Sequence, residues 1–342
     1  MLRFIELFAG IGGFRYGLEA INNEYARIGE ESKQKERSQG RVRTTNKRQI
    51  QLCPRNKSSF RCVWANEIDK YACQVYRKNF GEGELYEGDI RTIRPEDIPE
   101  AEMLVGGFPC QAFSIAGKRK GFEDTRGTLF YEIARLARAN RYKTLLLENV
   151  YGLLNHEQGD TFATILGVLD EMGYDVEWQV LNSKDFGVPQ NRERVFIVGH
   201  LRGKSRPKVF PIGESSQESN GTLGLQSPRQ TAGSLRATDY KGTHNNIREV
   251  KAVLTPDRQE KRQNGRRFKE NGEPSFTLTG QDLHGVMIDS KIRRLTPTEC
   301  ERLQGFPDGW TEGVSDTQRY KCLGNAVTTN VITAIGEKLC SQ

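Results

Sequence analysis

The sequence predicts an α/β fold in which a doubly wound parallel sheet is joined to a smaller, loop-rich region. Several apolar runs end in polar residues and alternate with helical stretches, which is typical of strands whose carboxyl ends meet along one edge of a parallel sheet. The chain has 342 residues, 36% of them hydrophobic, which suits one large or two modest domains with a core. The stretch from Arg202 to about His284 is instead rich in Gly, Ser, Thr, Asn and Arg, which favours loops.

The first predicted unit is a strand, a glycine loop and a helix. Residues 2–8 are mostly apolar, a loop with three glycines follows, and residues 14–21 have the pattern of a helix. Glycines let the backbone turn tightly and approach a ligand, and the free N–H groups of the next helix point toward it. The dinucleotide pattern G-x-G-x-x-G is incomplete because its last position is Arg15, which disfavours a nicotinamide or flavin site.

Acidic residues follow next. Residues 61–65 are predicted to form a strand that ends in Asn66 and Glu67, a helix covers about 69–80, and Asp89 comes soon after it. In nucleotide-binding α/β folds an acid at the end of the second strand holds a ribose. An exposed Glu at the end of a strand is an equally ordinary surface feature, so this residue alone leaves both interpretations open.

Further apolar runs bring reactive groups to the same predicted edge. Residues 103–105 lead through a glycine-rich turn to Cys110, residues 144–147 lead to Glu148, and residues 194–198 repeat the pattern. Nucleophiles are found on loops of this kind. The pattern therefore predicts a site along one edge of the sheet.

Helix signals appear near the C-terminus. Thr296 is expected to cap a helix that has Pro297 at its first position, with Glu299 completing a capping box. A final helix over about 326–339 has an apolar face that would pack back on the sheet. Within the loop-rich region, residues 275–279 are predicted to be strand-like.

The net charge of +7 is unevenly distributed. Residues 24–60 carry +6 and residues 201–290 carry +5, whereas residues 61–200 carry −5. The polar segment 24–60 is much longer than a usual helix-to-strand connection, so we predict a mobile surface insertion. Basic flanks beside an acidic centre suit a nucleic-acid substrate, although basic segments are also ordinary solvated surface.

The seven cysteines lie at positions 53, 62, 73, 110, 300, 322 and 340 and form no C-x-x-C pair. This arrangement favours a reducing compartment over a disulfide framework or a zinc site. Six of the cysteines are expected to be small buried side chains, whereas Cys110 lies on a glycine-rich loop after a strand. Because no apolar run approaches 18 residues and no signal peptide opens the chain, we expect no membrane span and a cytoplasmic location.

Six sequence blocks occur in one order along the chain. They are Phe8-Ala9-Gly10-Ile11-Gly12-Gly13-Phe14, Gly107-Phe108-Pro109-Cys110-Gln111-Ala112-Phe113-Ser114, Glu148-Asn149-Val150, Gln190-Asn191-Arg192-Glu193-Arg194, Arg294-Leu295-Thr296-Pro297-Thr298-Glu299-Cys300 and Gly324-Asn325-Ala326-Val327. In these blocks the chain resembles the cytosine carbon-5 DNA methyltransferase family, of the prokaryotic restriction-modification or orphan type. The resemblance covers roughly 1–23, 61–200 and 291–342.

The resemblance implies a Rossmann-like S-adenosylmethionine-dependent methyltransferase sheet with a smaller, loop-rich target-recognition domain. The catalytic and cofactor-binding domain would comprise residues 1–200 and 322–342, with the insertion 24–60, and the target-recognition domain residues 201–321. S-adenosylmethionine would be the cofactor and S-adenosylhomocysteine its product. The residues expected around it are Phe8, Ala9, Gly10, Gly12, Gly13, Glu67, Ile68, Asp89, Ile90, Pro109, Leu129, Asn325 and Ala326.

The implied reaction is methyl transfer to carbon 5 of a cytosine that is flipped out of a specific duplex DNA sequence. Carbon 5 is a weak nucleophile, so the thiolate of Cys110 would first add to carbon 6, and would leave after carbon 5 has gained the methyl group and lost its proton. Glu148 would hold or protonate ring nitrogen 3, and Arg194 would meet the carbonyl oxygen. Arg192, the fourth residue expected in catalysis, would lie near a phosphate and the loop. No metal is required.

The implied partner is double-stranded DNA, with neither a membrane nor a metal involved. Residues 109–128 would close over the flipped base, and the expected DNA-binding residues are Ser114, Lys118, Arg119 and Thr277. We expect a monomer in the prokaryotic cytosol or nucleoid, and a cognate restriction endonuclease encoded separately could accompany it.

Two alternatives stay open beside this interpretation. A tRNA cytosine carbon-5 methyltransferase would use the same core on RNA, and a non-catalytic DNA-binding relative would share the fold. The presence of Cys110, Glu148 and Arg194 argues against the second. The chain departs from the family pattern in the insertion 24–60, in Ala116 where a Ser is frequent, and in Ile68 where an aromatic residue is frequent.

Overall fold

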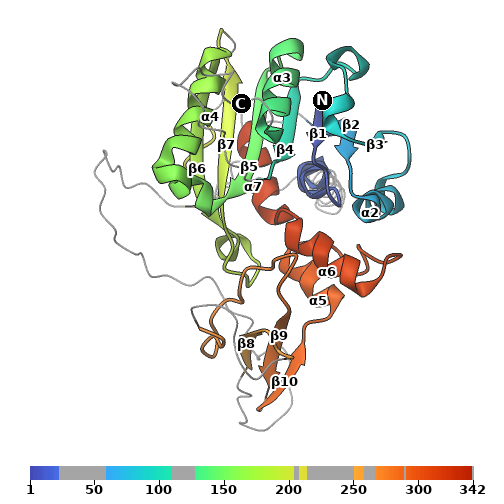
Figure 1. The fold of residues 1–342 in the computed structure, drawn as a ribbon, viewed down its shortest axis with the longest axis vertical. Helices are drawn as coiled ribbons and strands as arrows, with labels where there is room; N and C mark the ends of the chain where they lie inside the picture. Colours follow the sequence, from blue (N-terminus) through green and yellow to red (C-terminus); the bar gives the residue numbers. More distant parts are fainter. Residues whose placement is uncertain are drawn as a thin grey trace, which may run out of the picture.

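The computed structural model describes residues 1–22, 59–109, 128–203, 208–213, 250–257, 266–288 and 290–340. Within these residues a seven-stranded sheet has the order β3-β2-β1-β4-β5-β7-β6, and a three-stranded sheet has the order β10-β9-β8. The large sheet and its helices form the upper part of the molecule in Figure 1, and the small sheet lies below them with α5 and α6. The predicted insertion 24–60 falls almost entirely outside the described residues.

The strands of the two sheets are short and well delimited. They are β1 Leu2–Leu7, β2 Phe60–Glu67, β3 Leu85–Glu87, β4 Met103–Gly107, β5 Thr144–Val150, β6 Tyr174–Asn182, β7 Glu193–Leu201, β8 Val250–Leu254, β9 His284–Ile288 and β10 Lys291–Arg294. The α-helices are α2 Lys70–Phe80, α3 Leu129–Asn140, α4 Asp160–Glu171, α5 Pro297–Leu303, α6 Asp316–Asn325 and α7 Thr329–Cys340, and a first helix covers residues 13–22. Short 3-10 helices cover Ile90–Thr92, Pro95–Asp97, Tyr151–Gly159 and Ser183–Phe186.

The large sheet is parallel over five strands and antiparallel at β7. β1 pairs in parallel with β2 and β4, β2 with β3, and β4 with β5, whereas β7 is antiparallel to both β5 and β6. The prediction of a mainly parallel sheet is confirmed, but the strand at 194–198 was wrongly expected to run with the others. Because β7 is reversed, its first residues lie at the edge where the parallel strands end.

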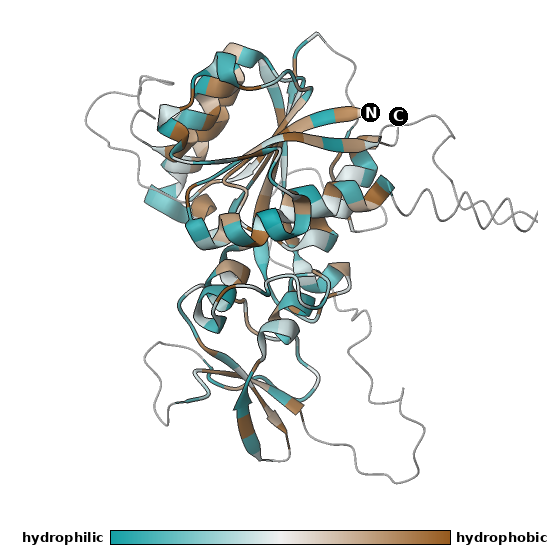
Figure 2. Ribbon diagram, turned by 90° about the vertical axis from the view of Figure 1, so that its right-hand side faces the viewer, coloured by the Kyte–Doolittle hydropathy of each residue, from teal (hydrophilic) through white to brown (hydrophobic). Residues whose placement is uncertain are grey.

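Helices cover both faces of this sheet. On one face the strands pack against α3 and α4, through side chains such as Ile5, Ile133 and Ile165. On the other face they pack against the first helix and α7, through Phe4 and Ile332 among others. Phe4 and Ile5 are adjacent and both fully buried, because a central strand sends alternate side chains into each layer. Figure 2 shows hydrophobic residues along the strands at the centre of this upper part.

A third buried cluster joins the lower part of the molecule to the large sheet's helices. Side chains of α5 and α6, and the loop between them, pack on Ile11 and on Val75 of α2. The Trp310 ring nitrogen donates a hydrogen bond of 3.1 Å to the carbonyl oxygen of Ile11.

The capping box at Thr296 is present, and the last helix packs back on the sheet as predicted. Residues 275–279 make no strand beyond a single bridge between Ser275 and Gln190. No helix in the described part is both long and apolar enough to span a membrane.

Candidate active site

The glycine loop connects β1 to the first helix with an unusual backbone. Phe8 has a φ of 54°, which is uncommon for a residue with a side chain and is typical of strained functional loops. A Cβ atom on Gly10 would meet no heavy atom within 4 Å, so the loop is open on that side. By contrast, a Cβ atom would come within 2.2 Å of the Phe80 ring at Gly12 and within 2.7 Å of Val327 at Gly13. The last two glycines therefore allow close packing, and Gly10 leaves room for a ligand.

The Glu67 carboxylate ties the glycine loop to the end of β2. Its Oε2 accepts a hydrogen bond of 2.7 Å from the N–H of Gly10, and its Oε1 accepts bonds of 2.8 Å from the N–H groups of Ile68 and Asp69. Oε2, which accepts only one of these bonds, keeps free acceptor capacity for a hydroxyl group. The Ile68 side chain is 64% exposed beside it.

The end of β3 carries the second acid. Asp89 accepts a bond of 3.0 Å from the Arg91 N–H and is paired with the Arg91 guanidinium, which lowers the pKa of Asp89. The next residue, Ile90, is buried in the core rather than open to solvent. Two carboxylates at neighbouring strand ends can accept hydrogen bonds from hydroxyl and amine groups and would repel a phosphate. This set of acceptors fits a nucleoside without phosphates, which S-adenosylmethionine is.

Asn66 joins these loops to one another. Its buried side chain donates hydrogen bonds of 3.2 Å to the carbonyl oxygen of Tyr86 and 2.8 Å to that of Gly88. Its own carbonyl oxygen accepts a bond of 2.9 Å from Ala9. Nothing in its sequence context singles out Asn66, except that it directly precedes Glu67.

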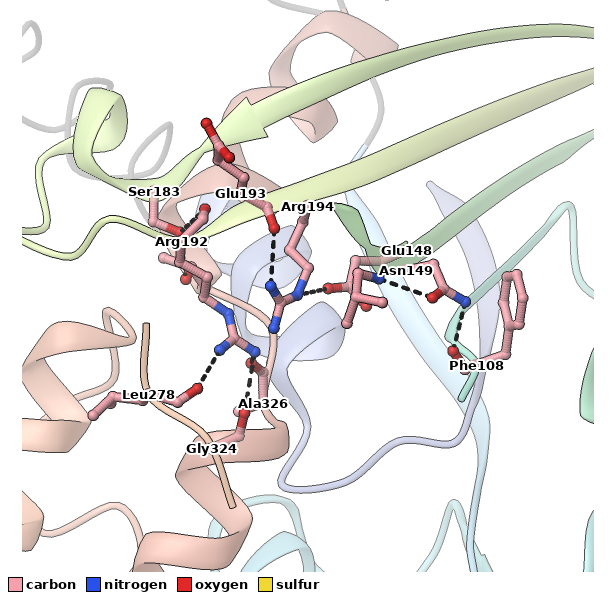
Figure 3. A network of polar contacts seen from close by, with 12 residues as sticks. Phe108, Glu148, Asn149, Ser183, Arg192, Glu193, Arg194, Leu278, Gly324 and Ala326 are labelled. Carbon is pink, nitrogen blue, oxygen red and sulfur yellow. Dashed lines mark hydrogen bonds and ion pairs between the residues drawn. The ribbon is translucent and has the colours of Figure 1, made fainter. Parts of the chain in front are cut away.

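The catalytic acid predicted from the sequence is paired with an arginine (Figure 3). The Arg194 Nε lies 2.9 Å from the Glu148 Oε1, and the two side chains are only 15% and 12% exposed. Glu148 is at the end of β5 and Arg194 at the start of the antiparallel β7, where Arg194 pairs with Val150 in the ladder. On the other side Glu148 is paired with Gly107 of β4, and a Cβ atom at Gly107 would lie 3.0 Å from the Glu148 Oε2.

The turn that leads to Cys110 is anchored beside this pair. The Asn149 side chain donates a bond of 2.8 Å to the carbonyl oxygen of Phe108. Pro109 follows and is exposed. Cys110 itself lies outside the described residues, as do Ser114, Lys118 and Arg119, so their predicted roles stay predictions.

Arg192 occupies a different environment from Arg194. It is 2% exposed, and its guanidinium donates to the carbonyl oxygens of Leu278, Gly324 and Ala326 at 2.7, 3.2 and 2.7 Å (Figure 3). This geometry does not fit the predicted contact with a phosphate, because a DNA backbone cannot reach a fully enclosed group. The sequence could not reveal this, since the three acceptors are main-chain atoms far along the chain.

The other predicted residues surround the same edge. Leu129 begins α3 and is half-buried, Asn325 is exposed at the end of α6, and Ala326 is buried. Thr277 donates its hydroxyl hydrogen to the carbonyl oxygen of Asn191 at 2.5 Å. Sequence reasoning missed a buried amide, Gln304, which donates to the carbonyl oxygen of Leu323 at 2.7 Å.

The five cysteines that the structure describes are all buried. Burial raises the pKa of Cys73, Cys300 and Cys322 to about 12, and it raises that of Cys62 still further. A thiol with such a pKa is almost never a thiolate near neutral pH. These cysteines are the small buried side chains that the sequence predicts.

Comparison with known proteins decides the family. The sequence matches the C-5 cytosine-specific DNA methylases over residues 2–341. The chain belongs to this family.

Relatives of the methylase are found among curated proteins and solved structures. It is 37% identical over 353 residues to the Type II methyltransferase M1.ScrFI of Lactococcus lactis subsp. cremoris, covering 98% of this chain and 77% of the relative. It is 33% identical over 365 residues to the Type II methyltransferase M.HhaI of Haemophilus parahaemolyticus, covering 100% and 95%. The fold is similar to that of S. pombe Dnmt2, with a TM-score of 0.61, 20% identity and coverage of 98% and 97%.

The predicted family, fold class and cofactor are thereby confirmed. The methylase is a DNA cytosine-5-methyltransferase that uses S-adenosylmethionine as methyl donor and DNA as substrate. The two alternatives, a tRNA methyltransferase and a non-catalytic relative, are not favoured over this function.

Proposed function

We propose that the methylase acts through a covalent Cys110 adduct on a cytosine flipped out of a specific duplex sequence, with Glu148 and Arg194 holding the base. The observation that carries this proposal is the Glu148–Arg194 ion pair beside Gly107, three residues before Cys110. A thiol that follows directly on this turn would reach the same space as the acid and the guanidinium.

Each group has a separate task on the cytosine ring. The Cys110 sulfur adds to carbon 6, and the electron pair released into the ring makes carbon 5 nucleophilic. Glu148 hydrogen-bonds ring nitrogen 3 and supplies the proton that offsets the charge arriving there. The Arg194 guanidinium can bond the carbonyl oxygen while its Nε keeps Glu148 oriented. When bound, S-adenosylmethionine supplies the methyl group.

The cofactor is proposed to lie across the ends of β1, β2 and β3. Glu67 would accept hydrogen bonds from the ribose hydroxyls, and Asp89 from the adenine amine. The open side of Gly10 leaves space for the main chain of the loop to approach the cofactor. Phe8, Ile68, Pro109, Leu129 and Asn325 would complete the walls.

Residues 1–200 and 322–342 are proposed to form the catalytic domain, and residues 201–321 to read the DNA sequence. The basic net charge of residues 201–290 supports this division, because phosphate contacts favour cationic surfaces.

We also propose a monomer that works in the prokaryotic cytosol, where its DNA substrate lies. A separately encoded endonuclease would fit the Type II names of the relatives.

Trapping on a fluorinated substrate tests the nucleophile. Fluorine at carbon 5 of the target cytosine cannot leave as a cation, so a covalent protein–DNA adduct should accumulate when S-adenosylmethionine is present. The DNA sequence that the enzyme recognises is first mapped by bisulfite sequencing of DNA from cells that express the enzyme. Peptide mass spectrometry should place the adduct on Cys110, and Cys110→Ser should form none while still binding cofactor. An adduct on another cysteine, or full methylation by Cys110→Ser, would overturn the proposal.

A further inference from the structure

Arg192 lies at the meeting point of three segments that are distant in sequence. Its own segment begins β7, Leu278 belongs to the loop-rich region, and Gly324 and Ala326 flank Asn325 at the end of α6. One guanidinium thus holds carbonyl oxygens from two other parts of the chain. Figure 3 shows the side chain pointing away from Glu148, toward these carbonyls.

This arginine is costly to bury. Burial lowers its pKa to about 9, and none of the described carboxylates forms an ion pair with it. Its Nε is buried without a hydrogen-bond partner. A buried guanidinium that faces only carbonyl dipoles contributes less to stability than an apolar side chain of the same size could. The planar fork of donors is nevertheless suited to fixing several acceptors at once.

Other buried contacts close the same junction. The Gln190 Oε1 accepts a bond of 2.8 Å from the Leu278 N–H, and its Nε2 donates one of 2.8 Å to the Leu303 carbonyl oxygen. A Cβ atom on Gly324 would lie 2.2 Å from the Thr279 main-chain carbon, so the two backbones touch. A shift of residues 275–280 would therefore displace Gly324 and, with it, the neighbouring Asn325.

We propose that Arg192 is a positioning residue that couples DNA binding to cofactor binding by locking the loop-rich region onto the residues around Asn325. This inference rests on the proposed function, in which residues 201–321 read DNA and Asn325 lines the cofactor pocket. Coupling of this kind is reciprocal, so duplex DNA should tighten cofactor binding by the same factor as cofactor tightens DNA binding.

Calorimetry with S-adenosylhomocysteine tests the coupling. Its Kd is measured with and without a duplex that carries the mapped site. For the wild type the duplex should lower this Kd by about fivefold or more. In Arg192→Met, which keeps the length but removes every donor, the ratio should fall to near one, and Arg192→Lys should lie between. A purely structural role would weaken both measurements alike and leave the ratio unchanged.

A matched control and a second variant keep the test decisive. Arg3→Met removes an arginine that pairs with Glu102 near the start of β1, at the opposite end of the sheet from the junction, and should keep the wild-type ratio. Should Arg192→Met fail to fold, Gly324→Ala, which forces Thr279 away, should abolish the coupling instead. An unchanged ratio in both variants, or no tightening in the wild type, would overturn the inference. If the wild type also forms no Cys110 adduct, the proposed function itself has failed.

Discussion

The two halves of the sheet edge are held by opposite chemistry. At the ends of β2 and β3, and at the glycine loop, carboxylates of Glu67 and Asp89 accept bonds from main-chain N–H groups. At β7, the guanidinium groups of Arg192 and Arg194 donate to main-chain carbonyl oxygens. Loops and helix starts leave N–H groups without partners, whereas helix ends and irregular segments leave carbonyls without them. Each half therefore carries the charge that satisfies its own backbone.

This contrast also divides the ligands between the halves. Acids that hold N–H groups keep acceptor capacity for the hydroxyl and amine groups of a nucleoside. Arginine and the single acid Glu148 instead offer donors and a proton to a base with a carbonyl oxygen and a ring nitrogen. The comparison predicts that changes in one half alter one ligand and spare the other, and substitutions in each half probe this prediction.

Apart from substitutions of Cys110 and Glu148 themselves, the largest effect on methyl transfer is expected from Arg194→Met. Without the guanidinium, Glu148 loses its 2.9 Å partner and the base loses a donor for its carbonyl oxygen. The methyl-transfer rate should fall by about 10²–10³-fold, the range for removing one donor that stabilises developing charge. Single-turnover kinetics measure the rate, and calorimetry should show cofactor binding within about twofold of the wild type. A large loss of cofactor affinity would contradict the division.

A smaller effect, on cofactor affinity, is expected from Asn66→Asp. The substitution replaces the amide donor with a carboxylate that faces the carbonyl oxygens of Tyr86 and Gly88. Leaving buried groups without a partner costs about 1–3 kcal/mol, so cofactor affinity should fall roughly tenfold. Asn22→Asp is a matched control, because Asn22 bonds the main chain of Phe60 at the other end of β2. If both variants weaken cofactor binding equally, Asn66 has no special link to the pocket.

The smallest effect on methyl transfer is expected from Glu6→Gln. Glu6 is fully buried, its Oε1 accepts N–H bonds from Phe14 and Arg15, and burial raises its pKa to about 8. Between the unfolded value near 4.5 and about 8, the folded protein keeps a proton that the unfolded chain has lost, so stability falls as pH rises. In Glu6→Gln, the free energy of unfolding measured with urea should fall less between pH 5 and pH 8 than in the wild type. The methyl-transfer rate should be unchanged. If the free energy of unfolding of Glu6→Gln falls with pH as steeply as that of the wild type, Glu6 is ionised in the folded protein.

Several residues at strand ends could be predicted from the sequence, but the contacts between those residues could not. Glu67 and Glu148 could be predicted because each follows an apolar run that is typical of a strand, and Asp89 was singled out only as an acid after a predicted helix. The direction of β7 was not, because an apolar run reads alike in both directions. β6 was not predicted because its apolar residues alternate with polar ones such as Glu177 and Gln179, which bond the main chain of Val209 and Ile212 rather than solvent.

The role of Arg192 shows a deeper limit. Its partners are carbonyl oxygens 86, 132 and 134 residues away, and main-chain acceptors leave no mark on the sequence. The resemblance names Arg192 and Arg194 together, but only the three-dimensional arrangement separates a buried junction from an ion pair at the site. Burial of this kind is a property of tertiary packing.

The most direct test of the division compares two substitutions in one assay, the single-turnover methyl-transfer rate as a function of S-adenosylmethionine concentration. Glu67→Gln should raise the half-saturating concentration by about tenfold or more while the rate at saturation stays near that of the wild type. Glu148→Gln should do the reverse, lowering the saturated rate by about 10²–10⁴-fold at an unchanged half-saturating concentration. If Glu67→Gln lowers the saturated rate alone, or Glu148→Gln shifts the half-saturating concentration alone, the two halves of the edge do not serve separate ligands.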